Sequence, residues 1–136
     1  MILGVTGSRT WKDRKTISGA LDEAHADFPA PSYENILIEG GASGADTLVR
    51  IAAHSRGWHV ATMKALWASY GKQAGHIRND GMIHLARHAD RWLAFIDQCE
   101  KPECLSREPH DSHGAAHCAE RAELAGIEVR RYGWRF

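Results

Sequence analysis

Short continuous apolar runs alternate along the chain with apolar residues at helical spacing. The runs predict five buried strands, at 2–6, 35–38, 58–63, 91–96 and 127–132. The spaced residues predict helices at 13–28, 47–56 and 114–125, and a mostly helical segment at 70–88 in which Gly71, Gly75 and Gly81 disfavour helix. Strands that alternate with helices favour parallel pairing and right-handed crossovers. The sequence therefore predicts one doubly wound α/β domain over residues 1–136, with a parallel sheet of about five strands.

The predicted helix starts carry recognisable capping residues. Thr10 and Asp13 fit a capping box for the first helix. In the second helix, the spacing of Leu48, Ile51 and Ala52 predicts a shared buried face.

A glycine-rich turn joins the second predicted strand to the second helix. Its sequence is Glu39-Gly40-Gly41-Ala42-Ser43-Gly44-Ala45-Asp46. Glycines let a ligand approach the backbone, and the partial positive charge of a helix N-terminus favours phosphate or carboxylate. The turn therefore predicts a phosphate site with free N–H groups. The same residues also fit a capping box in which Ser43 caps the helix and Asp46 reaches back, so a purely structural interpretation stays open.

The segments that follow the predicted strands should gather at one edge of the sheet. They are Gly7-Ser8-Arg9, Glu39-Gly40-Gly41, Met63-Lys64 and the residues from Asp97 onward. Parallel α/β sheets bind ligands beyond the carboxyl ends of their strands. We therefore expect the glycine turns at residues 7 and 40–41 to lie side by side.

Composition limits the classes of function. Lys and Arg number 17, as do Asp and Glu, so the net charge is zero and non-specific nucleic-acid binding is disfavoured. No apolar stretch approaches the length of a membrane span, and residues 1–6 read as a strand rather than a signal peptide. Three cysteines do not make a disulfide framework. We therefore expect a cytoplasmic protein with no membrane partner.

Three motifs occur in a characteristic order: Gly7-Ser8-Arg9-x-Trp11, Gly40-Gly41-Ala42-x-Gly44-Ala45-Asp46, and Trp67-x-x-Tyr70-Gly71-x-x-Ala74-Gly75-x-x-Arg78-Asn79-x-x-Met82. Together they resemble the SLOG superfamily, in particular its small YpsA/YspA-like branch, over nearly the whole chain. The resemblance implies a Rossmann-like fold, a homodimer, and a nucleotide or nucleotide-derived phosphorylated ligand. The ligand-binding residues it indicates are Gly7, Ser8, Arg9, Gly40, Gly41, Ser43, Gly44, Asp46, Arg78, Asn79 and Gly114.

The related LOG enzymes hydrolyse the N-glycosidic bond of nucleoside monophosphates, using a second motif, Pro-Gly-Gly-x-Gly-Thr-x-x-Glu. The matching segment here begins at Ser112, with Ala115 in place of threonine and Cys118 in place of the acidic residue. Glu120 lies two positions out of register. A hydrolase needs a placed carboxylate. We therefore expect a sensor or sequestering protein that binds without turnover and has no catalytic residue.

Two alternative functions remain. One is a phosphoribohydrolase or nucleosidase that uses Asp46 or Glu120 as its carboxylate. The other is a DprA-like nucleic-acid accessory protein, which the zero net charge disfavours.

Several side chains have both a binding and a structural interpretation. Arg9 and Arg78 are candidate phosphate ligands, or solvated surface charges. Asp46 is a candidate acceptor for a ribose hydroxyl, although a capping role competes. Trp67 and Tyr70 are candidates for stacking a base, or for core packing.

Residues 97–113 form an insertion rich in cysteine and histidine. Cys99, Cys104, His110 and His113 together could hold a tetrahedral structural Zn²⁺, with His117 as a substitute ligand. The alternative is a loop without metal, because such tracts are only compositional pointers. No other cofactor is expected.

Overall fold

Five parallel strands form one central sheet in the computed structural model, which describes residues 1–136. The strands are β1 (Ile2–Gly7), β2 (Ile36–Glu39), β3 (His59–Thr62), β4 (Arg91–Ile96) and β5 (Val129–Gly133). Their order across the sheet is β3-β2-β1-β4-β5, and each neighbouring pair is parallel. The predicted Rossmann-like α/β fold is confirmed, and each strand lies within two residues of its expected bounds.

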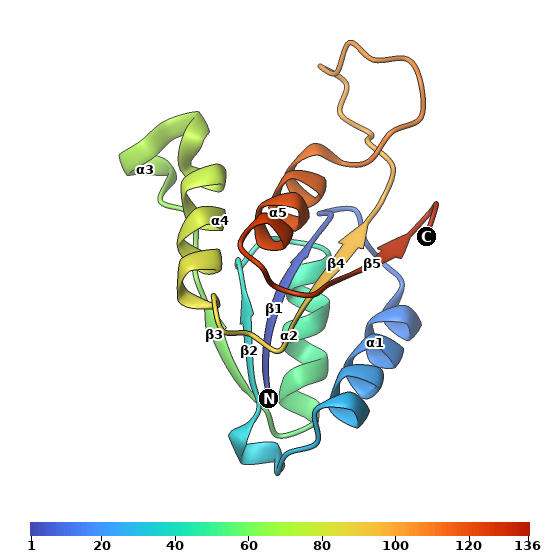
Figure 1. Ribbon diagram of the computed structural model, residues 1–136. Coiled ribbons are helices and arrows are strands. Elements are labelled where there is room, and N and C mark those ends of the chain that lie inside the picture. Colours follow the sequence, from blue (N-terminus) through green and yellow to red (C-terminus); the bar gives the residue numbers. More distant parts are fainter.

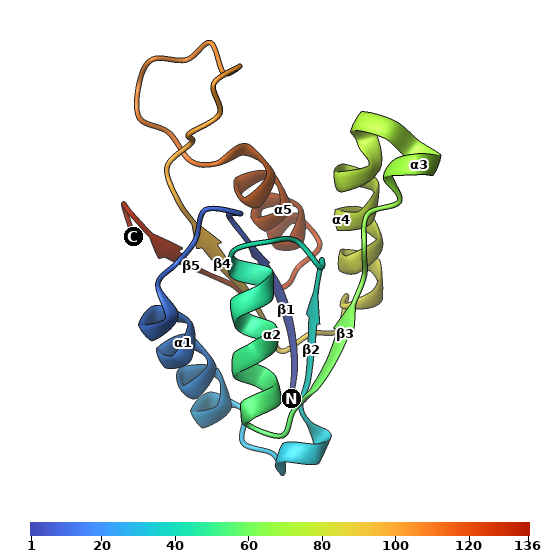
Figure 2. The same cartoon turned by 180° about the vertical axis from the view of Figure 1, so that it is seen from behind.

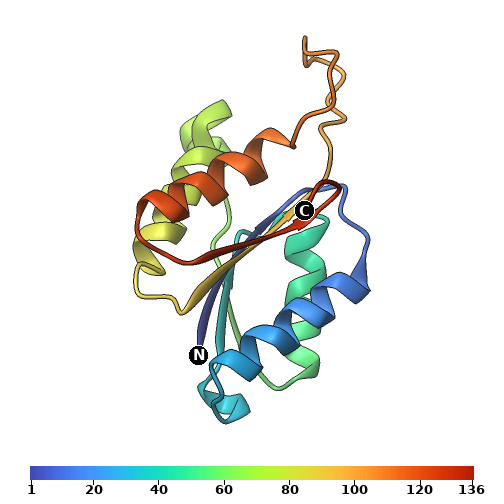
Figure 3. The same ribbon diagram turned by 45° about the vertical axis from the view of Figure 1, so that its right-hand side comes forward.

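Helices cover both faces of this sheet. They are α1 (Arg14–Asp27), α2 (Ala45–Ser55), α3 (Trp67–Tyr70), α4 (Ala74–Leu85) and α5 (His113–Leu124). Short 3₁₀ turns span Ser32–Glu34 and Gly71–Gln73. Figure 3 shows the sheet nearly edge-on, with α1 and α2 on one side and α4 and α5 on the other. No helix has the length and apolar composition required to cross a bilayer.

The core lies in two layers, one on each face of the sheet. All six residues of β4 are buried, and successive side chains point to opposite layers. Leu93 and Phe95 pack in the layer under α1 and α2, whereas Trp92 packs with residues of α4 and α5. Full burial of a large apolar side chain contributes about 1.5–3 kcal/mol. The central strands therefore form a firm base for the loops at their ends.

Residues 70–88 are mostly helical, as predicted, but the helix is interrupted near its start. The segment contains α3, the 3₁₀ turn Gly71–Gln73 and α4, which ends at Leu85. Gly71 adopts a φ of +58°, a left-handed conformation that ends α3.

Two local details of the first helices also differ from expectation. Leu48 and Ala52 pack against the core as predicted, but Ile51 is 57% exposed, and the fully buried residues of α2 are instead Ala45, Val49 and Ala53. Asp13 does cap α1, but it accepts the N–H of Thr16 at 3.0 Å. The hydroxyl of Thr10 takes no part in that cap and donates to Asp97 across the sheet edge at 2.7 Å.

The carboxyl ends of all five strands meet at one edge, shown at the top of Figures 1 and 2. The first turns of α2 and α5 lie at this edge, and the loop before α5 extends beyond it. Strand order reverses between β1 and β4, so their ends form the switch point of the sheet. Ligands of open α/β sheets bind at such points.

Candidate functional site

The turns after β1 and β2 lie in direct contact, as predicted. Ala45, the first residue of α2, donates its N–H to the carbonyl oxygen of Ser8 at 3.2 Å. A Cβ on Gly7 would lie 2.2 Å from Cβ of Ala45, so only glycine permits this approach. Gly44 has a φ of +75°, and a Cβ there would lie 2.4 Å from the carbonyl oxygen of Arg9. These glycines therefore bring the two turns together.

Ser8 lies buried at the switch point and contacts segments from both halves of the sheet. Its N–H donates to the carbonyl of Phe95 at 2.8 Å, and its Oγ accepts the N–H of Asp97 at 2.8 Å. The same Oγ lies 2.5 Å from Oγ of Ser112, the residue immediately before α5. Ser8 thus connects the starts of α2 and α5.

Both helix starts carry N–H groups that no protein atom accepts. At α2 these belong to Ser43, Gly44, Asp46 and Thr47. At α5 they belong to His113, Gly114 and Ala115. Free N–H groups and the helix dipole together favour a bound anion. The Cβ position of Gly114 faces open space, so a ligand has room to approach α5.

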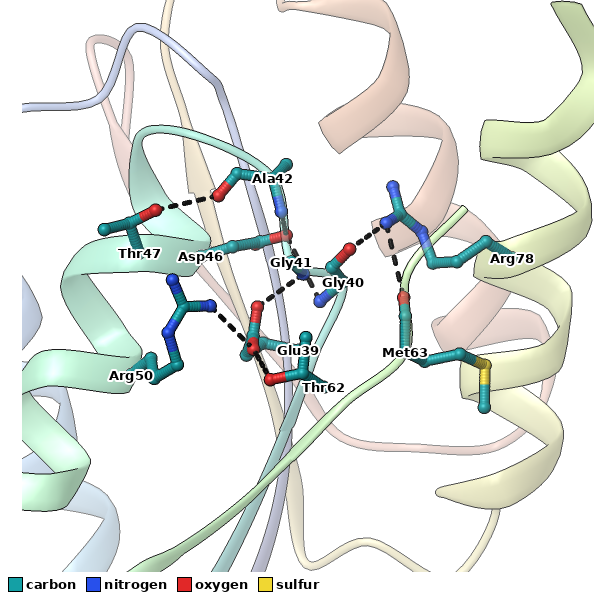
Figure 4. Close-up of polar contacts among 10 residues, drawn as sticks. All are labelled: Glu39, Gly40, Gly41, Ala42, Asp46, Thr47, Arg50, Thr62, Met63 and Arg78. Carbon is teal, nitrogen blue, oxygen red and sulfur yellow. Dashed lines mark hydrogen bonds and ion pairs between the residues drawn. The ribbon is translucent and has the colours of Figure 1, made fainter. Parts of the chain in front are cut away.

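Carboxylates already occupy part of the glycine turn, which corrects the expectation that its N–H groups are free. Oδ2 of Asp46 accepts the N–H groups of Gly40 and Ala42, each at 3.2 Å, and Glu39 accepts that of Gly41 at 2.5 Å (Figure 4). The unpaired N–H groups therefore begin only at Ser43.

The capping role predicted for Ser43 is also wrong. The N-cap residue of α2 is Gly44, and no side chain caps the helix. Asp46 does reach back as predicted, but to the glycine turn rather than to the cap residue.

Asp46 is a buried carboxyl with an unusual titration. Asp46 is 4% exposed, and its Oδ1 atom is buried without a hydrogen-bond partner. Burial, and to a smaller extent the nearby Glu39, raise the pKa of Asp46 to about 6, although the N–H of Ala42 and the charge of Arg78 oppose the rise. Asp46 is thus an acid that titrates near neutral pH at the edge of the candidate site.

Glu39 is fully buried at the end of β2, where the glycine turn begins, and its role was not predicted from the sequence. Its carboxylate accepts hydrogen bonds from Arg50 at 3.1 Å and from the hydroxyl of Thr62 (Figure 4). It therefore ties β2 to α2 and β3. The available signal was an acidic residue at the end of an otherwise apolar strand, which is costly to bury unless it is paired.

Arg78 braces the loops that follow β2 and β3. Its Nη1 donates to the carbonyl of Gly40, with a longer contact of 3.5 Å to that of Met63 (Figure 4). Its Nε donates to Oδ1 of Asn79 at 2.8 Å. Nη2 makes no hydrogen bond to the protein. Asn79 is itself buried and orients Arg78.

Arg9 and two aromatic side chains are exposed at the same edge. The guanidinium of Arg9 lies 5.8 Å from the ring centroid of Trp67. Trp67 and Tyr70 are each 50% exposed, so core packing is not their role. A positive side chain beside exposed aromatic rings suits a phosphorylated ligand with a planar base.

A cleft of about 1080 Å³ borders the switch point on the side of β5. Its lining includes Arg9, Thr10 and Asp97 together with the aromatic residues Tyr132, Trp134 and Phe136. Arg9 thus stands between this cleft and the glycine turn.

The four predicted metal ligands converge, although they span a loop with no helix or strand of its own. One donor atom from each of Cys99, Cys104, His110 and His113 lies within 4.8 Å of the others. Sγ of Cys104 is 3.5 Å from Nε2 of His110 and 3.7 Å from Nε2 of His113. His117 is not in the group, and its ring packs against His76 at 4.7 Å between centroids.

Cys118 stands where the LOG motif has its acidic residue. Cys118 is fully buried, and burial raises its pKa to about 11, although a hydrogen bond with Thr6 opposes the rise. Glu120 is exposed, and its carboxylate makes no hydrogen bond. It lies seven residues into α5, about 10 Å from the start of the helix at 1.5 Å per residue.

The fold and this edge define the protein as a Rossmann-like α/β domain in which two helix N-termini meet at the switch point. The chain belongs to the YspA, cpYpsA-related SLOG family, whose model matches residues 1–70. Family membership points to nucleotide-related ligand binding or LOG-like activity. The chain is also 37% identical over 135 residues to the Gene 61 protein of Mycobacterium phage D29, covering 95% of this chain and 94% of that protein. No solved structure matches it.

Proposed function

We propose that this protein binds a nucleotide or a nucleotide-derived phosphorylated ligand at the carboxyl edge of its sheet and does not turn it over. The observation that carries the proposal is the meeting of two helix starts on Ser8, each with unpaired N–H groups. Helix N-termini with free N–H groups are general phosphate sites. A phosphate between Gly44 and Gly114 would therefore replace water as the hydrogen-bond partner of the unpaired N–H groups at both helix starts.

The side chains around this point support the same ligand class. Arg9 and Nη2 of Arg78 are available to a phosphate, and Trp67 or Tyr70 to a base. Asn79 would act through Arg78 rather than touch the ligand.

Binding without turnover is supported by the chemistry of α5. Cys118 presents a buried neutral thiol where hydrolysis would require a carboxylate, and Glu120 lies outside the edge. The alternative N-glycoside hydrolase would have to use Asp46. A DprA-like nucleic-acid function would show strongly salt-dependent DNA binding, which we do not expect from a chain of zero net charge.

Native mass spectrometry of the purified protein tests the proposal by identifying a co-purifying nucleotide, and calorimetry with that compound or with AMP gives its affinity. A charged hydrogen bond contributes about 1.5–3 kcal/mol, so Arg9→Ala should weaken binding by roughly 10- to 150-fold. Arg87→Ala is the matched control, because Arg87 is exposed beyond the end of α4 and bonds only to His84. Equal affinities of the two variants would contradict the proposed site.

We further propose that the four-residue group binds a structural Zn²⁺. In a tetrahedral site with Zn²⁺ bonds of about 2.3 Å to sulfur and about 2.05 Å to nitrogen, a sulfur ligand and a nitrogen ligand lie about 3.6 Å apart. The Sγ–Nε2 distances of Cys104 are 3.5 and 3.7 Å. Nδ1 of His110 also lies 2.8 Å from the carbonyl of Glu108, so it can donate its proton there and leave Nε2 free for metal.

Elemental analysis tests the metal directly, on protein prepared without chelator. We expect about one zinc per chain, and less than about one-tenth would reject the site. Cys104→Ser should lose the metal, whereas Cys118→Ser should retain it, because Cys118 lies in the core outside the group.

A further inference from the structure

The base of the 97–113 loop is closed by backbone contacts. The N–H of Ser112 donates to the carbonyl of Asp97 at 2.9 Å, and the N–H of Cys99 to that of His110 at 2.8 Å. Gln98 and Asp111 form an antiparallel bridge between these bonds. The loop therefore leaves and re-enters the domain at one point.

The base of the loop lies next to Ser8, the buried serine at the switch point of the sheet. Ser8 accepts the N–H of Asp97 on one side of the loop base and contacts the hydroxyl of Ser112 on the other. The hydroxyl of Thr10 also donates to Asp97. These contacts couple the mobility of the loop base directly to the mobility of the turn after β1.

The four-residue group closes the loop across this base. Cys99 lies two residues after Asp97, and His113 is both a candidate ligand and the first residue of α5. A metal ion that joins Cys99 to His113 would hold the two sides of the base together. It would also fix Ser112 and the first turn of α5, whose N–H groups are unpaired.

We propose that metal bound by Cys99, Cys104, His110 and His113 acts as a clasp that orders Ser8 and the first turn of α5, and thereby strengthens anion binding at the carboxyl edge. The last step rests on the ligand site proposed above. By linkage, the ligand strengthens metal binding by the same factor.

The clasp acts through order rather than charge. A Zn²⁺ ion bound by two thiolates and two neutral imidazoles forms a site with no net charge. The electrostatic potential at the edge therefore changes little when metal binds. What changes is the freedom of the loop, which a ligand would otherwise have to restrict on binding.

Hydrogen exchange with Zn²⁺ alone tests the clasp without any nucleotide. We compare metal-free and zinc-loaded protein and follow the peptides that contain Ser8-Arg9 and residues 112–116, with the end of α2 as internal reference. Zinc should slow exchange in both peptides and leave the reference unchanged. Protection confined to residues 99–111 would overturn the proposal.

The variant Ser112→Ala separates metal binding from its effect on the turn after β1. It keeps all four ligands but loses the hydroxyl that contacts Ser8. We expect it to retain zinc and the protection of the loop, while the zinc effect on Ser8-Arg9 is reduced. Full transmission in Ser112→Ala would overturn the proposed route. Cys104→Ser should show no zinc effect in any peptide.

Calorimetry with AMP as the probe then measures the coupling. Allosteric couplings typically change affinity by about 5- to 150-fold, and we expect roughly 10-fold tighter binding of AMP with zinc. Equal affinities with and without zinc would overturn the coupling. If AMP and the co-purifying compound bind in neither state, the proposed function fails, and the exchange result alone decides whether the clasp orders Ser8.

Discussion

Asp46 offers the sharpest test of how the glycine turn is held. Its carboxylate accepts two backbone N–H groups, yet its pKa is raised to about 6 because desolvation outweighs those bonds. Replacing it by asparagine keeps an oxygen that can accept the N–H groups of Gly40 and Ala42 and removes the ionisation. The two proteins should therefore differ in how their stability depends on pH.

The sign follows from proton binding. An aspartate with a pKa of about 6 in the folded protein and an ordinary 3.8 when unfolded binds its proton more tightly in the folded state. Its contribution to the free energy of unfolding thus rises as pH falls from about 7 toward about 4. At about 1.36 kcal/mol per pKa unit, the full effect is about 3 kcal/mol, of which about 2 kcal/mol develops between about pH 7.5 and 4.5.

Acids that are paired with arginine act in the opposite direction. Asp111, Glu123 and Glu128 have lowered pKa values, chiefly because of hydrogen bonds with Arg135, Arg131 and Arg130, and they lose stabilising interactions as pH falls. The difference between wild type and Asp46→Asn removes these shared contributions.

Urea unfolding followed by tryptophan fluorescence, at about pH 7.5 and 4.5, measures this difference. We expect the wild type to gain about 2 kcal/mol relative to Asp46→Asn on acidification. Glu34→Gln serves as the control, since Glu34 is exposed and its carboxylate makes no hydrogen bond, and its difference from wild type should stay constant. A constant difference for Asp46→Asn as well would refute the account of its burial.

Two further predictions concern α2 and the oligomer. Gly44→Ala should destabilise the protein by about 1–3 kcal/mol in thermal unfolding, because of its positive φ and its contact with the carbonyl of Arg9, while Ser43→Ala should have little effect, because Ser43 makes no capping bond. We also expect a homodimer, for which light scattering at micromolar concentration should give twice 15.1 kDa, and a mass near 15.1 kDa would contradict it.

The sequence predicts the sheet well because buried parallel strands are short apolar runs with little competing interpretation. β4 was expected at 91–96 and is found there. Residues 70–88 are mostly helical as predicted, but the break at Gly71 was not placed, because helical spacing continues across it and its backbone conformation depends on the path of the chain. The buried face of α2 was predicted in part: Leu48 and Ala52 pack against the core, but Ile51 is exposed.

The position of the candidate site in the fold was predictable from the sequence, but the hydrogen-bond partners of its residues were not. Strand ends bring Ser8 and Gly44 together in any parallel sheet of this order. Whether Asp46 caps α2 or holds Gly40 and Ala42 depends on the three-dimensional path of the turn, which the residue types do not specify. The burial of Glu39 with Arg50 is likewise a tertiary pairing.

The surroundings of Asp46 and Cys118 favour ligand binding over catalysis. A general acid or base works best when its pKa lies near the working pH, and Asp46 meets that condition while Cys118 does not. However, the oxygen of Asp46 that is not bonded to the glycine turn is itself buried, which leaves it poorly placed to reach a substrate. We therefore expect chromatography to recover an incubated nucleotide intact. Release of free base or ribose phosphate, abolished by Asp46→Asn but not by Glu120→Gln, would instead make Asp46 the catalytic carboxylate and the protein a hydrolase.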